Sequence, residues 1–369
     1  HVTYVELIKA GDYKLNEITQ AHHQWHPHSI SLPINLNIKE KSLLSIQYLH
    51  PGNFALVMAS GIISIGMELL GNCILADILF FFAVGAWLVL IVLSLLRLLR
   101  FTAQLRDELL NPRLVFSYFT LVAATNIIGL LLMDRGYTSL ALACWVIAFG
   151  AWCSLLYLAF SVLTFLSHEH NVNIVHGGWL ITIVGTQSLV LLGSRIAPAL
   201  GQYAGYMMVE IHMLWGLGLI FYGIFVTLFC YRIFFLNLDP KDVSPLLWVI
   251  MGASAISASA GTSLMIADPL LPFLQAQRPF IDGVTLMLWA WGTWWLPMLV
   301  LFGIWKHFIR KIPLCYEPVL WSFVFPLGMY AVASAKLGLA AEFPPLQWIS
   351  SIMIWVAFTA WLLVLFGLI

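Results

Sequence analysis

Ten long apolar stretches follow one another between residues 50 and 369, and this succession restricts the chain to a membrane fold. Each can form a helix that crosses the hydrocarbon layer, which takes about 20 residues. The expected spans are 50–71, 77–99, 113–133, 138–166, 178–197, 206–234, 246–266, 280–305, 318–338 and 346–369. Only 9% of the residues are charged, against about 25% in a soluble domain. The sequence therefore predicts an all-α integral membrane protein with ten transmembrane helices.

These stretches alternate between two compositions. The odd-numbered ones are rich in Ser, Thr, Asn, Gln, Ala and Gly, whereas the even-numbered ones are rich in Phe, Trp, Leu and Val. Bulky apolar side chains can face acyl chains, but hydroxyls and amides lose solvation there unless they face protein or water. We therefore expect five helical hairpins in a quasi-five-fold array, with odd helices lining a central pore and even helices outside.

Prolines near the start of four odd stretches support an internal repeat. Pro51, Pro112, Pro245 and Pro318 suit the first helical turn, where a missing N–H costs nothing. Their spacing fits a unit of about 65 residues, the length of a helical hairpin. The alternative, that proline simply marks helix starts, stays open.

Lys and Arg are distributed unequally between the connections, and this predicts the orientation. If the chain enters from the cytoplasm, eleven lie on the inner side and four, Arg135, Arg195, Arg278 and Lys336, on the outer side. This excess of Lys and Arg on the inner side agrees with the positive-inside rule. We expect both termini in the cytoplasm and the protein in the plasma membrane, or in the inner membrane of a prokaryote. The net charge of zero gives no indication of a nucleic-acid partner.

Residues 1–48 differ from the rest and are expected to be a loosely ordered cytoplasmic tail before a transmembrane domain at 49–369. A histidine cluster at His22, His23, His26 and His28 allows a metal site, but a polar tail is favoured. His168, His170 and His176 are similarly interpreted as solvated loop residues, so no metal is expected.

The middles of the odd stretches are uncharged, which excludes several mechanisms. A proton pump needs carboxylates at mid-membrane, and a b-type haem needs paired histidines there. No nucleophile, base and orienting group come together, so we expect neither an enzyme nor a cofactor. A weakly polar pathway remains, although back-bonding to the helix is the alternative for each hydroxyl. The candidate pore-lining residues are Asn53, Ser60, Ser64, Asn126, Gln187, Ser254 and Ser257.

Two motifs carry a resemblance to a known family. The first is His50-Pro51-Gly52-Asn53-Phe54 with Ser60-Gly61, and the second is the segment Trp321 to Leu327, W-S-F-V-F-P-L. With them the chain resembles the tellurite-resistance/dicarboxylate transporter family over residues 48–369. That family includes bacterial tellurite-resistance permeases, fungal malate permeases and plant slow-type anion channels.

The resemblance implies a homotrimer in which each protomer has its own pore, occluded by a phenylalanine of the ninth helix. The matching residue is Phe325, directly before Pro326, which removes a helical hydrogen bond and would direct the ring inward. Phe323 is the rival, about 200° round the helix. Without the resemblance, a phenylalanine packed against neighbouring helices would be favoured.

Our leading hypothesis is a permease or channel that conducts small inorganic anions. The alternatives are a proton-coupled carrier of C4-dicarboxylates such as malate, which needs a saturable site and alternating access, and a tellurite-resistance permease. A membrane-bound sensor or an enzyme of lipid chemistry would need converging ionisable residues at one depth, and the sequence has none.

Overall fold

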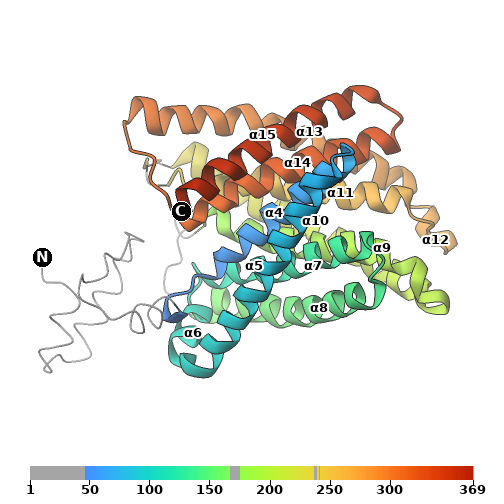
Figure 1. The fold of residues 1–369 in the computed structure, drawn as a ribbon, viewed down its shortest axis with the longest axis horizontal. Helices are drawn as coiled ribbons and strands as arrows, with labels where there is room; N and C mark the ends of the chain where they lie inside the picture. Colours follow the sequence, from blue (N-terminus) through green and yellow to red (C-terminus); the bar gives the residue numbers. More distant parts are fainter. Residues whose placement is uncertain (1–45, 167–174, 237–238, 241, 369) are drawn as a thin grey trace, which may run out of the picture. The chain divides into compact units, whose positions relative to one another are not determined.

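Helices make up all the regular structure in the part of the chain that the computed structural model describes, which is residues 46–166, 175–236, 239–240 and 242–368 (Figure 1). The predicted all-α class is confirmed. The histidine cluster at residues 22–28 and most of the expected tail lie outside the described residues, as do His168 and His170.

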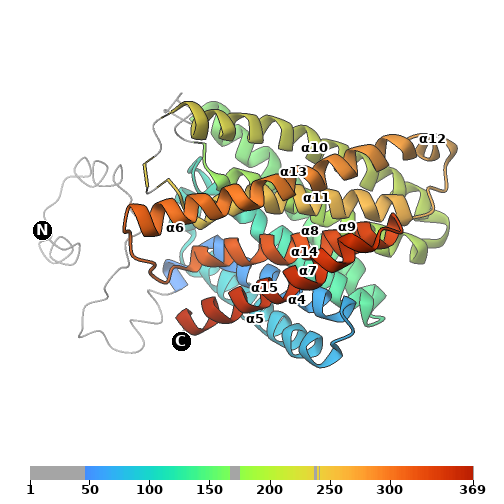
Figure 2. The same cartoon turned by 90° about the horizontal axis from the view of Figure 1, so that it is seen from above.

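Each expected span corresponds to one long helix within these ranges. The helices are α4 (Phe54–Leu69), α5 (Cys73–Arg100), α7 (Phe119–Asp134), α8 (Thr138–Ser161), α9 (Ile181–Ile196), α10 (Ala204–Phe235), α11 (Val249–Ile266), α13 (Arg278–Ile304), α14 (Trp321–Ala340) and α15 (Pro344–Leu368). Two short helices, α6 (Thr102–Leu109) and α12 (Pro272–Gln275), lie in connections. Successive long helices run side by side in alternating directions (Figures 1 and 2).

Nine stretches of the described chain are long and apolar enough to cross a membrane. One of them, Gly177–Phe235, is 59 residues long and contains both α9 and α10. The two helices are separated by a 3-10 segment, η7 (Ala197–Tyr203), in which Gly201 has a φ of 55°. Only glycine adopts this backbone conformation at little cost, so Gly201 allows the chain to reverse.

The odd-numbered helices close into a ring. α4 contacts α7, α7 contacts α9, α9 contacts α11, α11 contacts α14, and α14 returns to α4. Each also packs against the next long helix in the sequence, so that α5, α8, α10, α13 and α15 lie outside. We call these two sets the inner and outer helices, and the space that the inner ring encloses is the lumen.

Burial follows this division. In the membrane-spanning windows of α4, α7, α11 and α14, between 72% and 83% of the residues are buried. In those of α5, α8, α13 and α15 the share is between 22% and 33%. The outer helices therefore present the large apolar surface that the bilayer covers, as their Phe, Trp and Leu content predicts.

Every inner helix begins with a 3-10 turn. The five turns are η2 (Pro51–Asn53), η3 (Val115–Tyr118), η6 (Gly177–Leu180), η8 (Pro245–Trp248) and η10 (Pro318–Leu320). They contact one another in the same cyclic order as the inner helices. The inner helices are therefore parallel, and the lumen has a 3-10 end, where they begin, and a far end, where they stop.

Basic residues fasten three hairpins at the 3-10 end. The Arg97 guanidinium donates to the Leu49 carbonyl at 2.8 Å, and the Lys306 ammonium donates to the Val243 carbonyl at 2.8 Å. Arg232 donates in the same way to the Val175 carbonyl. Each acceptor directly precedes the residue that caps the 3-10 turn of the same hairpin. The cations that predict the orientation thus also hold the hairpins together.

One tryptophan of each outer helix donates its indole N–H to the next inner helix along the chain, with α15 closing on α4. The pairs are Trp87–Thr125 (3.2 Å), Trp152–Thr186 (2.8 Å), Trp289–Ser334 (2.9 Å) and Trp361–Ser60 (2.8 Å) through hydroxyls, and Trp215 with the Ser257 carbonyl (3.1 Å). A buried indole N–H usually finds an acceptor, and these bonds join each hairpin to the following one.

Candidate pore

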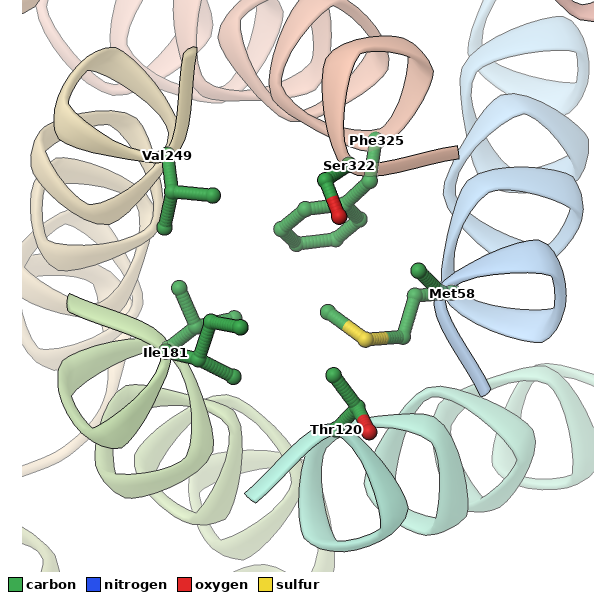
Figure 3. A pocket seen from close by; sticks show the side chains of 8 residues that line it. Met58, Thr120, Ile181, Val249, Ser322 and Phe325 are labelled. Atoms are coloured by element: carbon green, nitrogen blue, oxygen red, sulfur yellow. The ribbon is translucent and has the colours of Figure 1, made fainter. Parts of the chain in front are cut away.

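A small cavity lies on the axis of the inner ring, close to the 3-10 end. All five inner helices line it, through Ala55, Met58, Thr120, Ile181, Val184, Val249, Ser322 and Phe325 (Figure 3). Its volume is about 10 Å³, which is the lower limit for one water molecule. The lining is apolar except for two hydroxyls, so this part of the lumen is a hydrophobic constriction.

Phe325 extends into this space from the second turn of α14. Figure 3 shows its ring inside the circle of inner helices, with the Met58 thioether beside it, extending from the neighbouring helix α4. Both side chains are 3% exposed. Together they fill most of the cross-section, and the lumen is closed at this level.

Pro326 follows Phe325 and sits against α11 rather than in the cavity. A Cβ on Gly252 of α11 would meet the Pro326 ring at 2.9 Å, so the two helices approach as closely as glycine allows. Because proline has no N–H, the Ser322 carbonyl lacks its helical partner. The Ser322 side chain lines the cavity.

Phe323, the rival to Phe325 in sequence, points elsewhere. Its ring packs edge-on against Trp248 at 4.8 Å between centroids, and it does not line the cavity. The structure therefore distinguishes the two phenylalanines by their surroundings.

Beyond the cavity, helical spacing shows which residues continue the lumen face. From helical spacing we expect Ser188, four residues after Val184, and Met329, four after Phe325, to lie about 40° round their helices from these cavity-lining residues. Ile62 holds the same place on α4, four residues after Met58. All three are at most 1% exposed, and Ile62 packs against Gly328 of α14.

The hydroxyls and amides predicted to line the pore make bonds to neighbouring helices or to their own helix. Ser64 donates to the Ala76 carbonyl of α5 at 2.6 Å, and Ser254 donates to the Leu288 carbonyl of α13 at 2.6 Å. Gln187 donates to the Trp215 carbonyl of α10 at 3.2 Å. Ser257 bonds back to Ala253 at 2.7 Å. These side chains do not line the cavity, and their role in conduction stays a prediction.

The other predicted pore residues have mixed surroundings. Ser60 donates to the Leu56 carbonyl at 2.8 Å while it accepts from Trp361 of α15. Asn53 is half-buried where α4 begins. Asn126 donates its amide to the Ser188 hydroxyl at 2.9 Å, while its buried carbonyl oxygen has no partner among the described residues.

Two histidines cap inner helices at the 3-10 end. Nδ1 of His50 accepts from the Gly52 N–H at 2.9 Å, and Nδ1 of His176 accepts from the Gly178 N–H at 3.0 Å. Nε2 of His176 donates to the Arg113 carbonyl at 2.8 Å. Loss of solvation lowers the pKa of His176 to about 4. This ring is therefore neutral at pH 7, as its accepting Nδ1 requires.

No group of three or more metal-ligating side chains occurs in the part of the chain described. The cavity lining itself has no titratable side chain. Sequence analysis missed Met58, Ile181, Val184 and Val249, because apolar residues in a membrane helix are ordinarily assigned to packing.

Comparison with known proteins places this arrangement among transport proteins. The family model described as SLAC1, voltage-dependent anion channel, matches residues 48–369. Two uncharacterized transporters of Methanocaldococcus jannaschii are each 26% identical, one over 88% of this chain and 94% of its own length, the other over 85% and 91%. An uncharacterized membrane protein of Mycobacterium tuberculosis is 42% identical over 131 residues, which are 35% of this chain and 66% of that protein.

Proposed function

Because the chain belongs to the SLAC1 family of voltage-dependent anion channels, we propose that it conducts small inorganic anions through the lumen of its inner ring. It is a multi-pass membrane protein of a family of channels and transporters rather than enzymes. The observation that carries the proposal is the axial cavity lined by all five inner helices.

Phe325 is the gate in this proposal. Its ring and Met58 leave room for at most about one water molecule, and a hydrophobic constriction this narrow blocks ions because they would lose their hydration. The ring is held by packing rather than by a polar bond. A small displacement of α14 would therefore open the path without breaking hydrogen bonds of the gate itself.

Truncation of Phe325 tests the gate. In liposomes that contain the full chain, we expect Phe325→Ala to raise chloride flux at least about tenfold, since each 1.4 kcal/mol removed from a barrier is about a tenfold change in rate. Phe323→Ala is the matched control, because Phe323 packs on Trp248 outside the cavity. If Phe325→Ala folds normally and its flux equals that of wild type, the gate is assigned wrongly.

Uncoupled passage is favoured over a proton-coupled carrier of C4-dicarboxylates. Proton transfer through the constriction would need a titratable group there, and the eight residues that line it have none. A carrier would show saturable uptake driven by a pH gradient, whereas a channel gives currents that follow the anion gradient. Tellurite resistance, in this proposal, would follow from passage of an unusual oxyanion.

The assembly and placement are part of the same proposal. We expect a homotrimer with one lumen per protomer, since the inner ring closes within a single chain. We also expect the 3-10 end and both termini in the cytoplasm, with the protein in the plasma membrane or a bacterial inner membrane. The fastening of hairpins by Arg97, Arg232 and Lys306 at that end supports this orientation.

A further inference from the structure

Two cations occupy equivalent places at the far end of the lumen. Lys336 follows Phe325 by eleven residues on α14, and Arg195 follows Val184 by eleven residues on α9. Eleven residues are about three helical turns, roughly 16 Å along the axis and about 20° round it. Since Phe325 and Val184 line the cavity, helical spacing assigns both cations to the same side of their helices as these two residues.

Both cations interact with the same carboxylate, that of Asp134. Arg195 forms an ion pair with Asp134 at the end of α7, and the Arg195 and Asp134 side chains are 54% and 20% exposed. Lys336, which is half-buried, interacts electrostatically with both. Within the described residues the Lys336 ammonium makes no hydrogen bond and no direct ion pair. Arg195, Lys336 and Asp134 together therefore have a net charge of +1 at the far end of the lumen.

A surplus cation beside another cation is unfavourable unless something balances it. Simple compensation of the α14 helix dipole would account for Lys336 alone. It does not account for Lys336 and Arg195 lying on the lumen face at matching positions of two helices that are not neighbours in the ring.

We propose that Arg195 and Lys336 bind one small monovalent anion at the far end of the lumen, in line with Phe325. The site deepens the proposed function, on which it rests, and it narrows the class of substrate. Two cations and one carboxylate are neutralised by a single negative charge, whereas a dicarboxylate would leave a negative excess next to Asp134. The site thus selects monovalent anions before they reach the constriction.

Direct binding tests this site without any need for flux. The full chain in a neutral detergent is titrated with chloride, with gluconate holding the ionic strength constant, and binding is followed by the broadening of the ³⁵Cl NMR signal. We expect Lys336→Gln and Arg195→Gln each to weaken chloride binding at least about fivefold. Lys336→Arg keeps the charge and should retain the binding. Arg278→Gln removes an exposed cation at the start of an outer helix and should change nothing.

The outcomes separate this site from the gate. Unchanged chloride binding in both Lys336→Gln and Arg195→Gln overturns the site, whatever the flux of Phe325→Ala. Loss of binding in both variants supports it, even if Phe325→Ala does not conduct. Nitrate should compete with chloride, and malate at equal ionic strength should not. A malate affinity above that of chloride would overturn the selection of monovalent anions. Should Lys336→Gln not fold, Lys336→Met and Arg195→Gln decide the question.

Discussion

Gln187 and Ser188 are neighbours on α9, yet they point in directions about 100° apart and contact different helices. The Gln187 amide donates to the Trp215 carbonyl of an outer helix, whereas Ser188 accepts from Asn126 of the inner helix α7 and comes one turn after Val184, which lines the cavity. The same contrast holds on α4, where Ser60 bonds to Trp361 and Met58 fills the lumen. In both helices the outward face has the polar contacts and the lumen face is mainly apolar.

The main role of the polar residues of the inner helices is to join the inner helices to the outer helices. Hydroxyls accept the indole N–H groups of four outer helices and donate back to their own helix carbonyls. Such bonds between membrane helices contribute about 0.6 kcal/mol on average, up to about 1.7 kcal/mol. A constriction lined by methyl, thioether and phenyl groups can stay closed because the polar bonds lie elsewhere.

The largest expected effect on the outward face comes from Trp361→Ala. This 6% exposed side chain donates to Ser60 and packs edge-on against Phe82, so its removal leaves a cavity between α15 and α4. We expect a loss of about 3 kcal/mol in the free energy of unfolding. Reversible unfolding in mixed micelles measures it. Trp348→Ala on the same helix removes a 70% exposed ring and should cost far less.

A smaller effect is expected where inner helices touch each other. In Gly252→Ala the new methyl carbon would lie 2.9 Å from the Pro326 ring, and crowding of this kind costs about 1–3 kcal/mol. Gly216→Ala on α10 has nothing within 4 Å of the new carbon and should be neutral or slightly stabilising. Equal stability of the two variants would show that the contact between α11 and α14 is looser than described.

The smallest expected effects are those of replacing two serines of inner helices, Ser60 on the outward face and Ser322 on the lumen face. Ser60→Ala removes the acceptor of Trp361 and should cost about 1 kcal/mol without altering flux. Ser322→Ala, on the lumen face, should change chloride flux in a Phe325→Ala background and leave stability within about 0.5 kcal/mol. Thermal unfolding and liposome flux on the same preparations decide this. Equal changes in stability and in flux for the two variants would show that the two faces do not differ in this way.

The alternation of composition was sufficient to predict the class of fold, because lipid and protein neighbours demand different side chains. Composition does not give the angle at which a side chain leaves the helix, and for that reason Ser64 and Ser254 were expected in the pore although they bond to outer helices. A usable signal was present in Trp87, Trp152 and Trp289. An indole in the middle of a membrane helix needs an acceptor on a neighbour.

The lumen residues could be predicted only in part. Phe325 was predicted from the family resemblance. Nothing in the sequence distinguishes Met58 and Val184, which line the same cavity, from apolar residues that pack in a core. The positions of Arg195 and Lys336 on the lumen face depend on the register of two helices distant in the sequence. That register is fixed by packing, with Gly252 against Pro326 as one contact, and no local pattern encodes it.

Cysteine accessibility at adjacent positions of α9 tests whether anions pass along the lumen face. The experiment uses a Phe325→Ala chain whose five native cysteines are replaced, with either Ser188→Cys or Gln187→Cys added. A negatively charged thiosulfonate reagent should modify Ser188→Cys and block chloride flux, while Gln187→Cys stays unmodified behind α10. Rapid modification and block at Gln187→Cys, with Ser188→Cys unaffected, would contradict the account.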